Sequence, residues 1–161
     1  MTHCGASWSP SSNGLPQDVS GAIRVQALLV DSSASGTVYA GLGGGGVFKS
    51  GDGGARWSAA NSGLVSGNVF ALVAEPTDPR RIYAATDGGV FVTSDGGASW
   101  SSLNEGLTNL SIRSLVIDPF GGLLHAATLG GGVFDIEIVS ERERPKLLSR
   151  TRPVSRRLSR P

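Results

Sequence analysis

Short apolar runs alternate with turn residues through most of the chain. In the middle of the chain the runs cover residues 68–75, 81–85, 89–93 and 98–102, and glycine, proline and aspartate separate them. Runs of this length, rich in β-branched and aromatic residues and bounded by turn residues, predict β-strands. Residues 69–74 are apolar at odd and even positions alike. We therefore expect this strand to be covered on both faces of its sheet.

The four-run pattern repeats along the chain. The tryptophans Trp8, Trp57 and Trp100 stand at intervals of 49 and 43 residues, and Val-Phe pairs begin at Val47, Val90 and Val133, at intervals of 43. The longer first interval places a six-residue insertion in a loop between Leu15 and Ala27. A repeat of roughly 40 to 45 residues made of short strands predicts an array of similar sheets.

One eight-residue motif occurs twice, at residues 50–57 and 93–100, between the third and fourth runs of a unit. Its recurring positions are Ser50, Asp52, Gly54 and Trp57 in the first copy, and Thr93, Asp95, Gly97, Ser99 and Trp100 in the second. A hairpin connection explains these residue types, because glycine accepts positive φ and an aspartate or hydroxyl side chain bonds the N–H groups of its own turn. The tryptophan ring buries a large area against the adjacent sheet.

This motif resembles the Asp-box, or BNR repeat, of sialidases, xyloglucanase-type glycoside hydrolases, sortilin-type receptors and photosystem II assembly factors. The resemblance covers about residues 2–138. It implies a β-propeller in which the box is a structural fastener between the third and fourth strands of a blade, remote from any active site. Arg56 and His3 depart from the pattern, at positions for Ser or Thr and for Asp, and Ile136 and Ile138 leave the third copy without a box.

The number of predicted strands fits three blades. A run at residues 6–9 matches the fourth strand of a blade, two complete units follow, and the last unit supplies only its first three strands. We therefore predict an all-β, propeller-like array of about three four-stranded antiparallel blades. Propellers use 4 to 8 blades, so the ring is incomplete. The N-terminal run is the strand that the last blade lacks, an offset by which propellers commonly close.

An open wedge of three blades leaves apolar sheet faces bare, which soluble monomers rarely tolerate. Two interpretations stay open at this point. Either the chain pairs with copies of itself, most simply two copies giving six blades, or it is a piece of a longer parent protein.

Charge divides the chain at its end. Residues 1–140 carry a net charge of −5, whereas residues 141–161 carry +6. Residues 139–161 are rich in arginine and lack aromatics and any strand or helix period, so we predict a disordered tail after a propeller domain at residues 1–138. Such a tail can bind nucleic acid by releasing counterions, but an unstructured terminus is the simpler interpretation.

Cellular location is not predicted. Residues 1–8 lack the basic start and apolar core of a secretory signal, although proteins of the resembled family are often exported. The longest apolar run is too short to cross a bilayer, so no membrane partner is expected. One cysteine, Cys4, excludes a disulfide framework within the chain.

Carboxylates at the ends of the first strands are the candidates for chemistry. Glycoside hydrolysis needs two carboxylates facing one another, one with a raised pKa. Asp31, Glu75 and Asp118 occupy equivalent repeat positions, but each opens a turn, and turn chemistry explains them without catalysis. Asp31 and Asp118 remain the catalytic candidates.

Other polar residues have ordinary explanations at this stage. Asp87, Asp135 and Glu105 look isolated near turns, and Arg80 and Arg81 look like a solvated turn.

No metal or cofactor site is predicted. The only histidines, His3 and His125, are far apart and have no zinc spacing with Cys4. His125 stands where the other copies have tyrosine, so we expect it to fill space at a sheet edge. Glycines at residues 41–46 and 130–132 are expected to be tight links between second and third strands rather than a phosphate loop.

The sequence thus favours a non-catalytic Asp-box propeller module that acts as a scaffold or binding surface. It would be a fragment or a subunit of a multi-chain propeller, and its partners would be a second copy, a protein or a carbohydrate. The alternative is part of a carbohydrate-active glycoside hydrolase of the BNR-repeat type.

Overall fold

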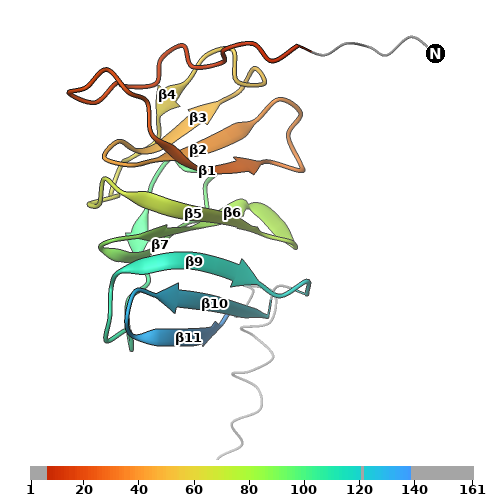
Figure 1. Cartoon of the computed structure of the whole chain (residues 1–161). Helices are drawn as coiled ribbons and strands as arrows, with labels where there is room; N and C mark the ends of the chain where they lie inside the picture. The colour runs from red at the N-terminus through yellow and green to blue at the C-terminus, as the bar shows by residue number, and fades with distance from the viewer. Residues whose placement is uncertain (1–6, 121, 139–161) are drawn as a thin grey trace, which may run out of the picture.

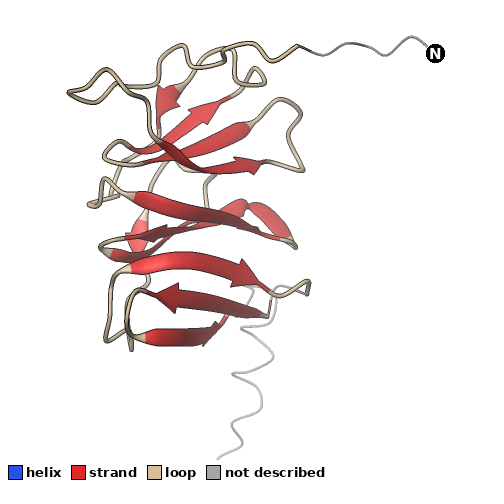
Figure 2. Cartoon of the chain, viewed as in Figure 1, coloured by secondary structure: helices blue, strands red, loops and turns tan. Residues whose placement is uncertain are grey.

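The computed structural model describes residues 7–120 and 122–138, and all regular secondary structure in this part of the chain is β-strand (Figure 2). The strands are β1 (Val25–Val30), β2 (Val38–Leu42), β3 (Gly46–Ser50), β4 (Ser58–Ala59), β5 (Val69–Glu75), β6 (Asp78–Thr86), β7 (Gly89–Thr93), β8 (Ser101–Ser102), β9 (Ile112–Ile117), β10 (Leu123–Thr128) and β11 (Gly132–Glu137). The predicted second unit is confirmed, although β6 begins earlier than residue 81 and β8 is shorter than 98–102.

The strands form three antiparallel sheets, which we call blade 1 (β1–β4), blade 2 (β5–β8) and blade 3 (β9–β11). Within each blade the strands pair in chain order, because each is joined to the next by a short turn. The blades stack one above another in chain order, with the first strands β1, β5 and β9 in contact from blade to blade (Figure 1). The predicted all-β array that does not close into a ring is confirmed.

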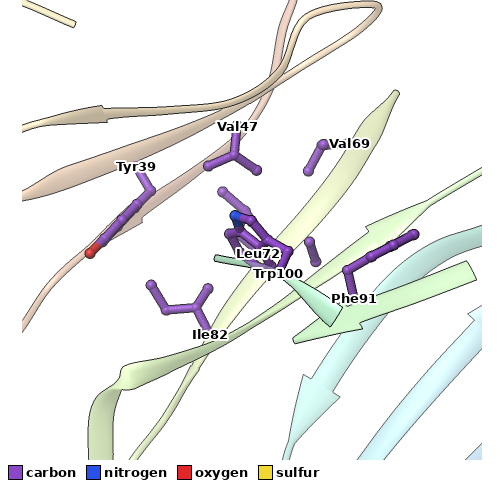
Figure 3. Close-up of a cluster of buried hydrophobic side chains, with 8 residues drawn as sticks. Tyr39, Val47, Val69, Leu72, Ile82, Phe91 and Trp100 are labelled. Carbon is purple, nitrogen blue, oxygen red and sulfur yellow. The ribbon is translucent and has the colours of Figure 1, made fainter. Parts of the chain in front are cut away.

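The apolar core lies between the blades. One cluster joins blades 1 and 2 around Tyr39, Val69 and Trp100, and another joins blades 2 and 3 around Tyr83, Ile112 and Leu124. β5 is therefore covered from both sides, as its continuous apolar run predicts. Figure 3 shows Trp100 in the middle of the first cluster, between side chains of both blades.

Small residues on the second strands let the blades approach closely. A Cβ atom added to Gly41 of β2 would lie 2.6 Å from Val69 Cγ1 of blade 2. Only a residue without a side chain fits there.

The prediction of a strand at residues 6–9 is wrong for its described part, because residues 7–9 form no strand. A fourth strand needs the edge of a third strand beside it, and the unpaired edge of this kind is that of β11. This edge lies at the opposite end of the stack from the N-terminal segment (Figure 1). In the part of the chain that the structure describes, blade 3 consequently has three strands instead of four.

The loops follow the predicted pattern. The insertion in the first unit lies in residues 16–24, which form no strand. The glycine runs at 41–46 and 130–132 link second and third strands as predicted, through turns at residues 44–45 and 129–131. The tail at residues 139–161, His3 and Cys4 lie outside the described residues. In the described part, no helix has the length and apolar character needed to span a membrane.

Candidate functional site

The second eight-residue motif is the corner between β7 and β8. Asp95 Oδ1 accepts hydrogen bonds from Thr93 Oγ1 at 2.6 Å and from the Ser99 N–H at 2.9 Å, and Asp95 Oδ2 accepts one from Ser99 Oγ at 2.6 Å. The Ser99 and Thr93 hydroxyls, in that order, hold the pKa of the Asp95 carboxyl far below its usual value. Gly96 and Gly97 take φ of 69° and 88°, which the tight corner requires.

The first motif builds the same corner between β3 and β4 with one donor fewer. Asp52 Oδ1 accepts from Ser50 Oγ at 2.8 Å and from the Arg56 N–H at 2.9 Å. The Arg56 N–H and the Ser50 hydroxyl lower the pKa of the Asp52 carboxyl. Arg56 offers no hydroxyl in place of Ser99, so the second oxygen of Asp52 has no counterpart of the Ser99 bond.

Each corner fastens its blade to the segment before it. Trp100 donates from Nε1 to the Ala60 carbonyl at 2.8 Å and from its backbone N–H to the Ser62 carbonyl at 2.8 Å. On the other side, Tyr39 Oη and Lys49 Nζ both donate to the Gly96 carbonyl at 3.0 Å. The corner of blade 2 is therefore bonded to β2, to β3 and to the loop that follows β4.

The N-terminal segment takes the corresponding position on blade 1. Trp57 donates from Nε1 to the Ser11 carbonyl at 3.0 Å and from its backbone N–H to the Asn13 carbonyl at 2.9 Å. Ser11 Oγ also donates to the Gly54 carbonyl at 2.6 Å. Residues 11–13 thus hold Trp57 as residues 60–62 hold Trp100.

At the junction between blades 2 and 3, residues 7–120 and 122–138 contain no such corner. Two cavities lie there, one of about 350 Å³ beside Tyr83, Val92 and Trp100, and one of about 120 Å³ beside Val90, Leu107 and Leu124. Tyr83 and Val92 occupy the repeat positions of Tyr39 and Lys49, as the strand registers show. The larger cavity therefore lies where a third corner would be bonded.

A largely buried ion pair borders the larger cavity, and Arg81 lines that cavity. Arg81 Nη1 lies 3.4 Å from Glu75 Oε2, and Glu75 Oε1 accepts a hydrogen bond from Thr77 Oγ1 at 2.7 Å. Burial first, and the Glu75 carboxylate second, raise the pKa of the Tyr83 hydroxyl to about 12. The predicted turn is wrong for both arginines, because Arg80 and Arg81 lie within β6. Arg80 is exposed as expected, whereas Arg81 is only one-fifth exposed.

The two catalytic candidates lie at the ends of first strands of different blades, with blade 2 between them (Figure 1). Asp31 Oδ1 accepts from the N–H and the hydroxyl of Ser33, at 2.8 and 2.7 Å. Burial acts to raise the pKa of the Asp31 carboxyl, but the bonds from Ser33 outweigh it and the pKa is lowered. Asp118 Oδ1 accepts from the N–H groups of Gly122 and Leu123 at 2.5 and 2.9 Å. Both carboxylates bond within their own turns.

A cluster that the sequence interpretation missed lies where blades 2 and 3 meet, and we call it the rim cluster: Ser66, Asn68, Phe70, Asp87 and Arg113. The exposed Arg113 guanidinium lies over the Phe70 ring, 4.1 Å from its centroid. Asp87 accepts a bond from Ser66 Oγ and one from Asn68 Nδ2 at 2.6 Å. The Asn68 and Ser66 bonds, and more weakly the Arg113 charge, lower the pKa of the Asp87 carboxyl. The pairing of β5 with β6 brings Asp87 beside Asn68, and the stacking of blade 3 on blade 2 adds Arg113.

Asp135 is not isolated either. Its Oδ1 lies 2.7 Å from His125 Nδ1, across the directly opposed pair of β10 and β11. The predicted position of His125 at a sheet edge is wrong, because β10 is the central strand of blade 3, and His125 makes a polar contact there rather than only filling space. No group of three or more His, Cys, Asp or Glu side chains suited to a metal ion occurs in the described ranges.

Comparisons with known proteins support the fold. No family model matches the chain, and no curated protein matches it. Among solved structures, an ancestral GH74 enzyme is 25% identical with a TM-score of 0.60, over 78% of this chain and 15% of that chain. PorZ of Porphyromonas gingivalis is 20% identical with a TM-score of 0.57, over 70% and 17% of the two chains. YCF48 from Cyanidioschyzon merolae is 16% identical with a TM-score of 0.53, over 71% and 34%.

These proteins are β-propellers, and the first of them is a GH74 enzyme. The chain spans about a third or less of the length of each of these three relatives.

Proposed function

We propose that the chain is a non-catalytic propeller module of the Asp-box type that binds a protein partner through the rim cluster. In this proposal the corners with Asp52 and Asp95 are structural fasteners. The observation that carries it is the exposed Arg113 guanidinium stacked on Phe70, with Asp87 held beside it by Asn68 and Ser66. Arginine and aromatic side chains supply a large share of the binding energy at protein interfaces.

Two further observations support a binding role over catalysis. Asp31 has a lowered pKa, whereas a general acid near neutral pH needs a raised one. The solved structures that resemble this chain include YCF48 bound to D1 peptide, at 17% identity and a TM-score of 0.53, and a chain of the mitotic checkpoint complex, at 16% and 0.54. Longer chains of similar fold thus occur in contact with a peptide and in a protein complex.

The test is a binding screen of the full chain on a peptide array and, in parallel, on a glycan array. We expect peptide signals that Arg113→Ala abolishes and that Arg80→Ala leaves unchanged, because Arg80 is an equally charged, exposed residue away from the rim cluster. Glycan signals lost in the same variant would replace the protein partner by a carbohydrate. Peptide signals that survive Arg113→Ala would overturn the proposed site.

A second candidate function is part of a glycoside hydrolase. It is favoured by the resemblance to the ancestral GH74 enzyme and by Glu105 and Asp135, which both line the smaller cavity. Against it, a volume of about 120 Å³ is well below the roughly 300 Å³ at which ligand pockets begin. Hydrolysis of xyloglucan and other β-glucan oligosaccharides by the full chain tests this function.

The control variants are Asp31→Asn, Asp118→Asn, Glu105→Gln and Asp135→Asn. Turnover that one of these removes, with the fold retained, would establish the enzyme. Absence of turnover at high protein concentration would exclude it.

A further inference from the structure

One tryptophan has no socket, and one blade has no tryptophan. Trp57 and Trp100 are 8% and 5% exposed, whereas Trp8, at the same repeat position, is fully exposed. Blade 3 has no fourth strand among the described residues, and the repeat interval of 43 residues places Glu143 at the sequence position of its tryptophan. A buried indole contributes strongly to the stability of a junction, so the mismatch is costly.

The smaller cavity matches the surroundings of Trp100. Val90, Leu107 and Leu124 line it, and their counterparts one repeat earlier are Val47, Leu64 and Ile82. These three counterparts belong to the Trp100 cluster or pack against it. The cavity between blades 2 and 3 is therefore an unfilled tryptophan socket.

Three equivalent glycines give independent support. A Cβ atom on Gly14 would lie 2.3 Å from the Trp57 carbonyl oxygen, and one on Gly63 would lie 2.2 Å from that of Trp100. Gly106 has the same positive φ, 82°, but a Cβ atom there would meet nothing within 4 Å. The backbone at Gly106 has kept the shape that receives a tryptophan residue, although none lies against it.

We propose that residues 7–10 of a second copy of this chain form the fourth strand of blade 3, with Trp8 in the smaller cavity. The register follows from blade 1, where Ser58 and Ala59 pair with Lys49 and Phe48. By the repeat, Ser9 of one copy pairs with Asp135 of the other, and Pro10 pairs with Phe134.

Proline is compatible with this register. The Ala60 N–H bonds to the Val47 carbonyl, so the alternation of an antiparallel ladder points the N–H of Ala59 away from β3. Pro10 stands at the position of Ala59, where no N–H is needed, and such outward positions of edge strands accept proline.

A second copy, rather than the same chain, supplies the strand. Residues 11–13 are bonded to the corner of blade 1, at the opposite end of the stack from β11 (Figure 1). Within one copy, residues 57–62 connect the fourth strand of blade 1 to the corner of blade 2. Residues 8–13 then bridge blade 3 of one copy and blade 1 of the other.

The two end faces of the stack also need a cover. Val133 is 67% exposed, whereas its counterparts Val47 and Val90 are buried against the following blade. Leu28 is 65% exposed, whereas its counterpart Leu72 is buried against the preceding blade. Placing the end face of blade 3 on that of blade 1 covers both. Two copies of three sheets give six blades, within the usual 4 to 8.

The solution mass of the full chain tests this pairing, and it does not depend on the proposed function. We expect about twice 16.5 kDa by native mass spectrometry or light scattering. Trp8→Ala raises the dissociation constant of the dimer about 100-fold or more, because a buried aromatic anchor is lost. Trp8→Phe, which refills part of the socket, recovers part of the affinity. A monomer at all concentrations up to the millimolar range, or a dimer whose affinity Trp8→Ala leaves unchanged, would overturn the proposal.

Cross-linking tests the register. On a Cys4→Ser background, copies with Ser9→Cys are mixed with copies with Asp135→Cys under oxidising conditions. The Cβ atoms of opposed residues in an antiparallel pair lie about 4.5–5.5 Å apart, so a disulfide-linked dimer is expected after a small backbone adjustment. Ser32→Cys, in an exposed turn, replaces Ser9→Cys as the matched control and forms no link. Equal linking by the control contradicts the exchange. A link within one chain, in a variant that carries both Ser9→Cys and Asp135→Cys, also contradicts it.

Discussion

The junction between blades 1 and 2 and the junction between blades 2 and 3 are built from the same repeat, yet only the first is complete. At the first junction Trp100 fills the space between the blades, and the Gly96 carbonyl accepts bonds from Tyr39 and Lys49. At the second junction the strands, the apolar lining and Gly106 are all present, but among the described residues two cavities stand in place of the corner and its tryptophan.

The difference separates two contributions that a complete propeller mixes. Stacking of the first three strands holds blade 3 in place without the corner, because Ile112, Leu115 and Leu124 are buried against blade 2. The corner adds a further, local fastening. The loss of unfolding free energy when the corner is removed from the first junction can therefore be measured separately from the effect of restoring a corner at the second.

The largest effect is expected from Trp100→Ala. Truncating a buried tryptophan costs about 3–5 kcal/mol of unfolding free energy, and this change also removes the bond to the Ala60 carbonyl. Trp8→Ala, measured at a protein concentration below association, changes the unfolding free energy by less than about 0.5 kcal/mol, because Trp8 is exposed. Urea denaturation followed by far-UV circular dichroism provides both values. Equal costs for the two variants would contradict the assignment of an empty socket.

The next effect distinguishes the glycine that a tryptophan backbone contacts, Gly63, from its counterpart without such a contact, Gly106. Gly63 and Gly106 have φ of 79° and 82°, so alanine brings the same backbone strain of about 1 kcal/mol at both. Only at Gly63 does the added Cβ meet the Trp100 carbonyl, and overpacking adds about 2 kcal/mol. We expect losses of about 3 kcal/mol for Gly63→Ala and about 1 kcal/mol for Gly106→Ala in the same denaturation assay of the monomer.

If the second copy binds as proposed, Gly106→Ala weakens the dimer more than it weakens the fold. A fold that loses as much stability from Gly106→Ala as from Gly63→Ala would show that Gly106 has such a contact as well.

The sequence predicted the features that are formed within a single repeat unit. Spacing of 43 residues located the strands of blade 2, and the residue types of 93–100 located the corner. The strand at 6–9 was predicted wrongly because a fourth strand requires an edge that lies beyond three blades. Its composition is right, but no sequence pattern states whether a neighbouring edge is within reach.

Contacts between blades were beyond prediction for a related reason. The Tyr39–Gly96 bond joins residues 57 positions apart, and the Arg113–Phe70 contact joins residues on two blades. Such pairs depend on how far one blade is rotated over the next, which the period of the repeat does not specify. Arg81 was likewise placed in a turn because its partner, Glu75, is brought opposite it only by the pairing of β5 with β6.

A smaller effect concerns the docking of the corner on blade 1. Tyr39→Phe removes a buried hydroxyl from the Gly96 carbonyl, which Lys49 still bonds, and costs about 1 kcal/mol. Lys49→Val, which copies Val92 of blade 2, costs less because the ammonium is partly exposed. Conversely, Val92→Lys gives no gain in unfolding free energy, because no glycine carbonyl of the described residues takes the position over Tyr83 that Gly96 takes over Tyr39. A clear stabilisation by Val92→Lys would indicate that a corner already occupies the second junction.

The smallest effect separates the two corners from each other and appears only in acid. The pKa of the Asp95 carboxyl is lowered first by the Ser99 hydroxyl, whereas Asp52 faces Arg56 and lacks this donor. A carboxyl whose folded pKa lies below its unfolded value of about 3.9 stabilises the fold above that pH, and the contribution is lost as the pH falls further. Arg56→Ser adds the missing hydroxyl, so the pKa of Asp52 falls towards that of Asp95.

Carboxyl-carbon NMR titration measures this shift directly. In urea denaturation between pH 2 and 6, Asp95→Asn removes more of the acid-dependent stability than Asp52→Asn, because the folded state of Asp95 releases its proton at lower pH. Both contributions are small, since the carboxylates are exposed and water competes for their bonds. Identical titration of the two carboxyls, or an unchanged pKa of Asp52 in Arg56→Ser, would show that the hydroxyl at this position does not control the corner.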